Sequence, residues 1–329
     1  MAPQPLSFIP SPSSNGFHLG PLFIHFYGLM YVIGITLAVL ITQRRARNAG
    51  GDPAVVGDVA LWAVPAGIIG GRIYFDITTP SQIPHVWYGV FAVWSGGLGI
   101  WGGIAAGVLV GAWRVRRAGQ SVALFADAVA PALLVAQAIG RIGNYFNQEL
   151  FGRPSTLPWA LKIQPQHRPA GFYHQFATFQ PTFLYELIWD LLLAAVLIWL
   201  GNRRSIRPPG LFALYVAGYS AFRIFEESLR IDNSEHFLGL RLNFYVAGAL
   251  TIVGLAWFVI SQRRAPAPVT AADADDSAAA NSEDSAAAGA DSADSEDEEP
   301  SDASAKADDT EPDSEETAEA DDAVAGDRK

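Results

Sequence analysis

The chain of 329 residues contains no cysteine. This absence excludes a thiol nucleophile, a structural disulfide and a cysteine-based metal site within the chain. The histidines and carboxylates lack the spacing of metal ligands, so we expect neither a metal nor another cofactor. Missing cysteines also fit a protein whose working face meets an oxidising compartment.

Large apolar residues are missing from the C-terminal part, although 50% of the chain is hydrophobic. No Phe, Trp, Tyr, Leu or Ile follows Ile260, and residues 265–329 hold 22 of the 33 acids but only three bases. The remaining 11 acids and 19 bases lie in residues 1–264, so a basic, apolar body carries an acidic tail. We expect this tail to be disordered, because it has nothing to bury. The basic residues of the body form short clusters between apolar runs, so we do not expect a nucleic-acid partner.

Seven long apolar stretches divide the body. Most approach the ~20 residues that a helix needs to cross a hydrocarbon core of ~30 Å. They lack the polar face of helices in soluble proteins, and the sequence therefore predicts an all-α polytopic membrane protein with seven transmembrane helices. The stretches lie at 22–42, 54–75, 87–112, 122–140, 182–200, 210–226 and 244–262.

Arginine clusters predict the orientation of these helices. They follow every odd-numbered stretch, at 44–47, 114–117, 203–207 and 263–264. Seven crossings place all four clusters on one side, which the positive-inside rule assigns to the cytoplasm. The first 21 residues contain no Lys or Arg, so we do not expect the first stretch to be a signal peptide. The predicted organisation is an extracytoplasmic segment (1–21), a seven-helix domain (22–264) and a disordered cytoplasmic tail (265–329).

Charged residues inside the apolar stretches are functional candidates, because a charge at membrane depth is costly. Arg72 and Arg223 lie near the outer ends of their stretches, where a guanidinium can reach a lipid head group. We interpret Asp127 and Asp190, nearer the cytoplasm, as structural partners of hydrogen-bond donors. Glu186 is a further candidate at this depth. Close helix packing is predicted by regularly spaced glycines at 67, 71, 99, 103, 107 and 111.

The most informative stretch is GRIGNYFNQELFGR (140–153), where the fourth apolar run ends. If the helix continues, Arg141, Asn144 and Gln148 share a face through their i, i+3, i+7 spacing. A guanidinium there can bind phosphate oxygens bidentately, while asparagine amides donate to the remaining oxygens. The pattern favours an anion site at the outer membrane boundary over a simple interfacial cap.

This stretch resembles the signature of bacterial prolipoprotein diacylglyceryl transferases, Gly-Arg-x-Gly-Asn-Phe-x-Asn-x-Glu-x-x-Gly, and departs from it only at Tyr145. Further matching pieces are HFYGLMY (25–31), GGR (70–72), WSGGLG (94–99), QPTFLYE (180–186) and RIFEESLR (223–230). The resemblance implies a seven-helix protein of the bacterial plasma membrane with its active site towards the extracytoplasmic leaflet. It also implies transfer of the diacylglyceryl group of phosphatidylglycerol to the lipobox cysteine thiol of a prolipoprotein, which forms a thioether and releases glycerol phosphate.

The resemblance also implies roles for individual residues. Catalytic candidates are Tyr27, Arg141, Asn144, Glu149, Arg223 and Glu227, and candidates for binding phosphatidylglycerol are Arg72, Arg141, Gly152 and Arg223. If 223–230 is helical, Arg223, Glu227 and Arg230 share a face, so we expect Glu227 to hold both arginines. A surface ladder of ion pairs is the alternative.

One departure from the family concerns the base. Many members have histidine where this chain has Trp101, and tryptophan cannot accept a proton. Because the substrate thiol has a pKa of about 8.5, a base or a positive field is needed to form the thiolate. The base is then Glu149 or Glu227, or none is needed. The aromatic segment 153–181 is either part of the entry for the lipobox peptide or an interfacial belt in contact with membrane lipids.

Two other functions compete with this interpretation. A transporter for an anionic solute would use Arg72, Arg141 and Arg223 as a cluster at the membrane midplane. The sequence shows no internal repeat of the kind that transporters have, and its polar residues gather at the outer boundary. A membrane scaffold that docks through the acidic tail leaves residues 140–153 unexplained, and deletion of 265–329 would abolish its function but not that of a transferase.

Overall fold

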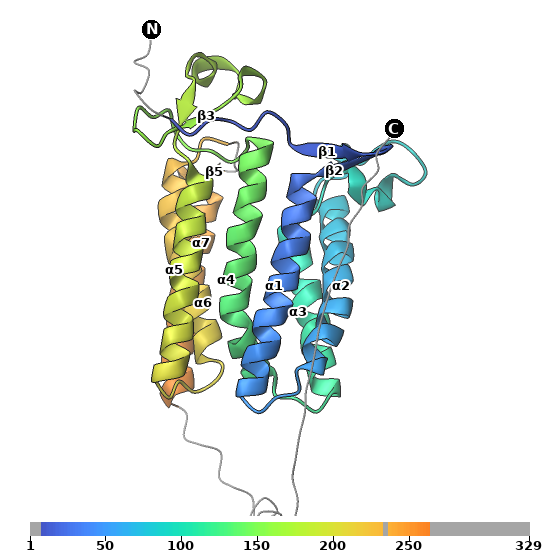
Figure 1. Cartoon of the computed structure of the whole chain (residues 1–329), viewed down its shortest axis with the longest axis vertical. Coiled ribbons are helices and arrows are strands. Elements are labelled where there is room, and N and C mark those ends of the chain that lie inside the picture. The colour runs from blue at the N-terminus through green and yellow to red at the C-terminus, as the bar shows by residue number, and fades with distance from the viewer. Residues whose placement is uncertain (1–7, 233–235, 264–329) are drawn as a thin grey trace, which may run out of the picture. The chain divides into compact units, whose positions relative to one another are not determined.

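The computed structural model of the chain describes residues 8–232 and 236–263. In these residues the main elements are seven long helices that lie side by side, with short strands gathered at one end (Figure 1). The helices are α1 (Phe26–Asn48), α2 (Ala54–Thr78), α3 (Ile100–Arg117), α4 (Val122–Asn147), α5 (Thr182–Arg203), α6 (Gly210–Leu229) and α7 (Leu242–Arg263). The predicted tail, 265–329, lies outside the described residues.

Five of these helices, α1, α2, α4, α5 and α7, are long and apolar enough to cross a membrane. The chain is therefore a mostly helical, multi-pass membrane protein. Among the described residues, α3 and α6 do not meet the same criterion: α3 has only 18 residues and carries three arginines in its last turn, and α6 includes three charged residues.

The third predicted span, 87–112, begins too early. The structure starts α3 at Ile100, and residues 89–95 form two 3-10 turns instead. Gly96 and Gly97 then have φ of 83° and 78°, a left-handed conformation that ends a helix and that glycine adopts without steric cost. Hydrophobicity alone made this loop indistinguishable from the helix that follows it.

Helix direction brings the arginine clusters together. The helices α1, α3, α5 and α7 all run towards the end of the bundle that lies away from the strands (Figure 1). Their last turns include Arg45, Arg114, Arg203 and Arg263. We call this the basic end of the bundle, and the opposite end the strand end.

Glycines let α2 and α3 approach closely, as predicted. The backbone N–H of Gly99 donates to the carbonyl of Gly71 at 2.8 Å. A Cβ on Gly102 would lie 2.2 Å from the carbonyl oxygen of Gly70, and one on Gly103 would lie 3.2 Å from that of Gly67. Side chains larger than hydrogen would force these two helices apart.

The rest of the bundle is built around α4, which packs on α1 and on α5, while α6 packs on α7. A core cluster joins α4, α5 and α6 through Leu134, Ala194, Leu197 and Leu211. At the basic end, Asp127 Oδ1 accepts from the backbone N–H of Phe212 at 2.9 Å, in the first turn of α6. The predicted structural role of Asp127 as a partner of a donor is thereby confirmed.

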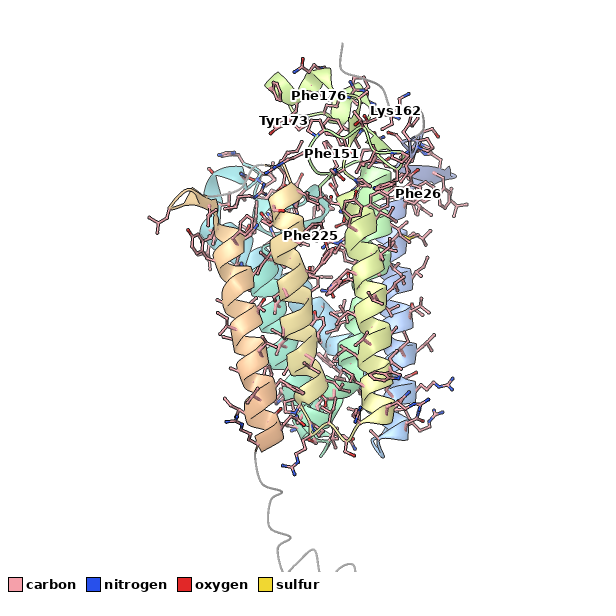
Figure 2. The ribbon with its side chains drawn as sticks, turned by 90° about the vertical axis from the view of Figure 1, so that its left-hand side faces the viewer. Phe26, Phe151, Lys162, Tyr173, Phe176 and Phe225 are labelled. Carbon is pink, nitrogen blue, oxygen red and sulfur yellow. The ribbon has the colours of Figure 1, made fainter. Side chains whose placement is uncertain are left out.

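A small subdomain covers the strand end near α4 and α5. The strands β3 (Leu161–Lys162) and β4 (Thr178–Phe179) pair antiparallel, and Ile9 extends the ladder by bonding to Ala160 and Lys162. Figure 2 shows Phe151, Tyr173 and Phe176 in this subdomain, above the helices. Their cluster buries Phe151, Leu161, Ile163 and Phe179, which fixes the chain that follows α4.

Two further hairpins lie at the strand end. The first consists of β1 (Gly16–Leu19) and β2 (Leu22–His25), which lead into α1. The second consists of β5 (His236–Phe237) and β6 (Leu240–Arg241), which lead into α7. Both hairpins thus direct a helix from the strand end towards the basic end.

Candidate active site

The signature stretch begins as helix and ends as a turn. The helix α4 continues through Asn147, and Gln148 then adopts a left-handed φ of 53°. Arg141 and Asn144 share a face, as predicted, and Arg141 Nη1 donates to Asn144 Oδ1 at 3.2 Å. The turn directs Gln148 elsewhere: its Nε2 donates to the carbonyl of Pro12 at 3.3 Å, and its Oε1 accepts from the backbone N–H of Gln164 at 2.9 Å.

Gly152 lies where three segments meet. Its N–H donates to the carbonyl of Gln180 at 2.9 Å, and the next residue donates to the carbonyl of Leu229. A Cβ on Gly152 would lie 2.8 Å from Gln180 Cβ and 3.0 Å from the Leu229 oxygen. Gly152 therefore lets the chain after α4 pack against the beginning of α5 and the end of α6.

One buried carboxylate joins Arg141 to a second arginine. Glu186, on α5, is 0% exposed; its Oε1 accepts from Arg141 and, at 3.0 Å, from the hydroxyl of Tyr219. Its Oε2 lies 3.5 Å from Nη1 of Arg223, on α6. Arg223 also pairs with Glu226. The helices α4, α5 and α6 thus assemble two guanidinium groups around one carboxylate.

Amides of the signature hold its acid. Glu149 Oε1 accepts from Asn144 Nδ2 at 2.8 Å and from Asn147 Nδ2 at 3.3 Å. The Glu149 backbone N–H also donates to the carbonyl of Asn144 at 3.2 Å. Glu149 is an exposed residue, whereas Asn144 is 4% exposed. Asn144 therefore connects Arg141 to an acid that is open to the surroundings.

Tyr27 faces the same region from α1. Its ring packs against Gly143, where an added Cβ would lie 2.4 Å from the Tyr27 ring. Its hydroxyl lies 3.2 Å from that of Tyr31 and interacts electrostatically with Glu149 and Arg141. The structure thus brings Tyr27 next to the residues of the signature, although Tyr27 lies 114 residues before Arg141 in the sequence.

Comparisons with known proteins identify the family of the chain. The family model described as prolipoprotein diacylglyceryl transferase matches residues 15–260. The chain belongs to this family. Over 261 residues it is 51% identical to the phosphatidylglycerol–prolipoprotein diacylglyceryl transferase of Frankia alni. The aligned region covers 78% of this chain and 68% of that relative. Over 273 residues it is 44% identical to the protein of the same name from Bifidobacterium adolescentis. That aligned region covers 78% of this chain and 81% of the relative.

Of the two arginines predicted to pair with Glu227 in this member of the transferase family, the structure confirms one. Glu227 is 1% exposed and its Oε2 lies 3.3 Å from Arg223, as predicted. Its second arginine is Arg241 at 2.6 Å, and not Arg230, which lies just past the end of α6. The i, i+7 spacing failed because Arg230 leaves the helical path and pairs with Asp232 at 2.6 Å.

Asp232 carries the outer part of this ion-pair network. It accepts from Arg230 and also pairs with Arg241 at 3.2 Å. Partial burial acts to raise the pKa of Asp232, but the hydrogen bond and charge of Arg230, together with the charge of Arg241, hold it below its ordinary value. The carboxylate therefore keeps its charge beside the two arginines.

Arg72 lies in another cluster. It is 5% exposed, and its guanidinium donates to the carbonyls of Val90 at 2.8 Å and Gly96 at 2.8 Å, and also to those of Gly89 and Gly97. It pairs with Asp76 at 3.1 Å as well. These contacts explain the form of the loop before α3, and they give no support to the predicted contact of Arg72 with a lipid.

Sequence reasoning missed several members of the network. Glu186 was a candidate without a partner, although its place in QPTFLYE and the cost of a charge at that depth were the signals for it. The sequence analysis assigned no role to Glu226 or Tyr219. It also missed the pairing of Arg241 with Glu227, because a hairpin separates the two residues and helical spacing does not extend across it. Asp190 has no hydrogen-bond partner for either carboxylate oxygen among the described residues, so the predicted donor for it is wrong.

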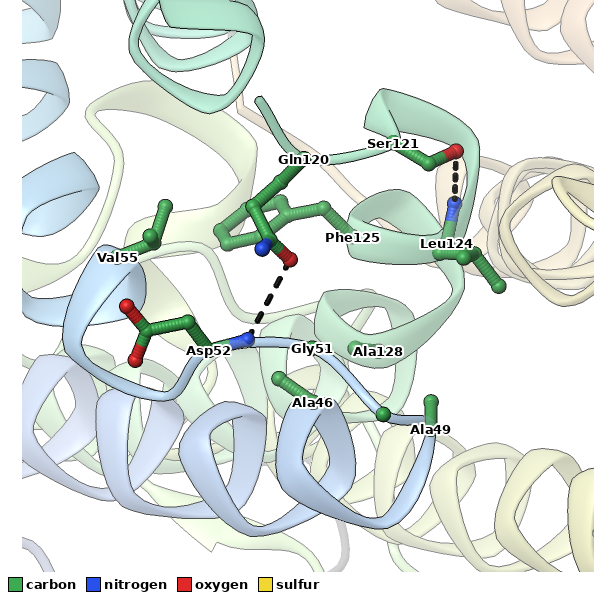
Figure 3. A pocket seen from close by; sticks show the side chains of 11 residues that line it. Ala46, Ala49, Gly51, Asp52, Val55, Gln120, Ser121, Leu124, Phe125 and Ala128 are labelled. Carbon is green, nitrogen blue, oxygen red and sulfur yellow. Dashed lines mark hydrogen bonds between the residues drawn. The ribbon is translucent and has the colours of Figure 1, made fainter. Parts of the chain in front are cut away.

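Two other features give no chemistry to the site. Trp101, in the first turn of α3, is 46% exposed, and its indole cannot accept a proton. A small pocket lies at the basic end, where the α1–α2 connection meets that between α3 and α4 (Figure 3). Gln120 Oε1 accepts there from the backbone N–H of Asp52 at 3.4 Å, so the pocket is a junction of two turns. Within residues 8–232 and 236–263, no group of histidines and carboxylates could hold a metal ion.

Proposed function

We propose that this chain transfers the diacylglyceryl group of phosphatidylglycerol to the lipobox cysteine thiol of a prolipoprotein, the first step of lipoprotein maturation. The observation that carries the proposal is the pair formed by Arg141 and Arg223, which lie on either side of Glu186 near the strand end. Family membership and the names of the relatives support the same reaction.

The reaction needs stabilisation of a phosphate leaving group. The thiol sulfur attacks the terminal glycerol carbon of the diacylglyceryl group, and the bond from that carbon to the phosphate oxygen breaks. Negative charge grows on this oxygen as glycerol phosphate leaves. Arg141 and Arg223 provide the positive charge and directed donors that stabilise it. The thiol proton passes to a base.

Glu149 is the base that the geometry favours. Its Oε1 is held by two amides and its side chain is exposed, so its second oxygen is open to a substrate. Glu227 is the poorer candidate, because Arg223, Arg241 and Asn243 all contact its buried carboxylate. Asn144 positions Glu149 relative to Arg141, while Tyr27 and Gly152 shape the surrounding wall.

The location of the site follows from an orientation that we also propose. All seven helices cross the bacterial plasma membrane, with the N-terminus outside and the acidic tail in the cytoplasm. The arginines at the basic end support this direction through the positive-inside rule. The active site then faces the extracytoplasmic leaflet, and the aromatic segment 153–181 forms part of the entry for the lipobox peptide.

The test is transfer from radiolabelled phosphatidylglycerol to a lipobox peptide by the purified full chain. We expect label on the peptide cysteine with the wild type and near-background transfer with Arg141→Ala. The matched control is Arg116→Ala, an exposed arginine on α3 at the basic end, which should retain wild-type transfer. Transfer that survives in folded Arg141→Ala moves phosphate binding away from Arg141. No transfer by the folded wild type would reject the proposed function.

The rival transporter is not favoured. It requires Arg72, Arg141 and Arg223 to form one cluster. Arg72 is instead occupied by the carbonyls of the loop that precedes α3, whereas Arg141 and Arg223 share Glu186. The relatives are named as transferases.

A further inference from the structure

Glu186 uses the same donors that a lipid phosphate needs. Its two oxygens face Arg141 and Arg223, and Tyr219 donates to it from α6 at 3.0 Å. A phosphate held by both arginines must share or replace these contacts. Because Glu186 is 0% exposed, water cannot readily stabilise its charge once the arginines turn to a second anion.

The surrounding charges are already balanced. Ion pairs connect four arginines, at positions 141, 223, 230 and 241, with four carboxylates, at positions 186, 226, 227 and 232. A phosphodiester adds one negative charge to this network. No additional cation contacts Glu186 in the described part of the chain, so a proton is the simplest compensation.

The protonation state of Asp190 limits where this proton can bind. It lies one helical turn from Glu186 on α5, is 0% exposed, and has no hydrogen-bond partner for either oxygen within the described residues. A buried carboxylate without donors is too costly to keep its charge beside a second acid, so Asp190 is neutral. Since Asp190 already carries its proton, the next one has to bind elsewhere. Of the acids in the network, only Glu186 contacts both Arg141 and Arg223, so it is the acid that phosphate binding leaves without partners and the acceptor that we assign.

We propose that binding of the lipid phosphate at Arg141 and Arg223 is coupled to uptake of one proton by Glu186, with neutral Asp190 as a positioning residue beneath it. The phosphodiester anion and the proton enter together, the proton binds a Glu186 carboxylate oxygen, and no bond of the lipid breaks. This inference rests on the proposed function. The charged and titratable groups that surround the pair are Arg141 from α4, and Tyr215, Tyr219, Arg223 and Glu226 from α6.

The coupling predicts how affinity depends on pH. Above the pH at which free Glu186 loses its proton, the affinity for phosphatidylglycerol should fall by about tenfold per pH unit, because one proton is bound with each lipid. Glu186→Gln needs no proton, so its affinity should change by less than about twofold over the same range. A purely structural role of Glu186 would weaken binding equally at every pH.

The direct measurement is calorimetry on the full chain in detergent. Dihexanoyl phosphatidylglycerol is titrated into the wild type in two buffers of different ionisation enthalpy, and the difference in heat gives the protons bound. We expect about one proton per lipid, and none with dihexanoylglycerol, which lacks the phosphate. Lipid binding with no proton uptake, in a protein that performs the transfer, would overturn the coupling alone. Failure of both binding and transfer would overturn the proposed function as well.

Variants then locate the proton. Glu186→Gln should abolish uptake, whereas Asp190→Asn should retain it, because its amide is neutral like the side chain it replaces. The matched control Asp58→Asn, at the basic end beside Arg114, should also retain it. Loss of uptake in Asp190→Asn, with retention in Glu186→Gln, would assign the proton to Asp190 and overturn the proposal. If Glu186→Gln does not fold, Asp190→Asn and Glu226→Gln still test the assignment: both should retain uptake, and loss of uptake in either one would move the proton to that acid.

Discussion

At the scale of single residues, the two candidate bases have different surroundings. Glu149 is exposed and is held through one oxygen by the amides of Asn144 and Asn147. Glu227 is buried and contacts Arg223, Arg241 and Asn243. A base that takes the proton of a substrate thiol needs an oxygen that the substrate can reach, whereas an acid that positions arginines is best buried and paired with them. The two acids therefore suit different tasks.

The first prediction separates these tasks. Glu149→Gln should lower kcat for transfer by about 10² to 10⁴, the usual contribution of a general base, and leave KM for phosphatidylglycerol nearly unchanged. Glu227→Gln should mainly raise KM, because Arg223 loses a partner. Steady-state kinetics over a range of pH, with lipid and peptide varied in turn, distinguishes the two patterns. Equal kcat values for Glu149→Gln and the wild type at every pH would rule out Glu149 as the base.

The second prediction concerns Asp232, whose pKa is held below its ordinary value by Arg230 and Arg241 despite partial burial. A carboxyl with a lowered folded-state pKa contributes stability above its unfolded-state pKa and loses it as pH falls through the folded value. The wild type should therefore lose thermal stability as pH falls below about 4, and Asp232→Asn should lose less over the same range. Unfolding midpoints in detergent at several pH values provide the measurement. Parallel curves for the two proteins would contradict the assignment.

At the scale of elements, the pair α2 and α3 depends on backbone contact. Glycines at positions 70, 71, 99, 102 and 103 bring carbonyl oxygens of one helix against the other. Arg72 fixes the loop between the two helices by binding its carbonyls. Because this loop contains the two positive-φ glycines, its shape and the start of α3 are determined together.

The third prediction tests this contact. Gly102→Ala should lower the stability of the protein by about 1–3 kcal/mol, because its Cβ would lie 2.2 Å from the Gly70 oxygen. Gly248→Ala is the matched control, since the same methyl group on α7 meets nothing within 4 Å. Thermal unfolding of both variants in detergent gives the comparison. Similar midpoints for the two variants would mean that α2 and α3 separate without cost.

At the scale of the whole molecule, helix direction and charge agree on one polarity. The arginine-rich turns lie at the end of the bundle opposite the signature stretch. A transferase that receives a lipid and a peptide needs its site at a membrane surface where both can arrive. The proposed orientation places that surface outside the cytoplasm.

The fourth prediction uses the absence of cysteine, which makes single-cysteine labelling free of background. Ser14→Cys, ahead of the first hairpin, should react with a membrane-impermeant maleimide in intact bacterial cells. Ser205→Cys, between α5 and α6, should react only after permeabilisation. Both serines are exposed, so accessibility within the protein does not separate them. The reverse labelling pattern would invert the proposed topology.

Sequence alone determined the apolar segments, the placement of the arginine clusters at one end and the signature that places the chain in its family. These features are local or periodic, and the membrane imposes them directly through helix length and the cost of charge. The loop before α3 escaped this reasoning, because it is as apolar as a helix and is bent by glycines and by the distant Arg72.

Only the tertiary structure decided which charges meet. Glu186 joins Arg141 to Arg223 from three different helices, and Arg241 reaches Glu227 across a hairpin, whereas Arg230 leaves its helix for Asp232. Ion pairs of this kind depend on helix packing and on where helices end. Neither is encoded in the spacing of residues along one segment, since a guanidinium selects its partner among all the carboxylates that packing brings within reach.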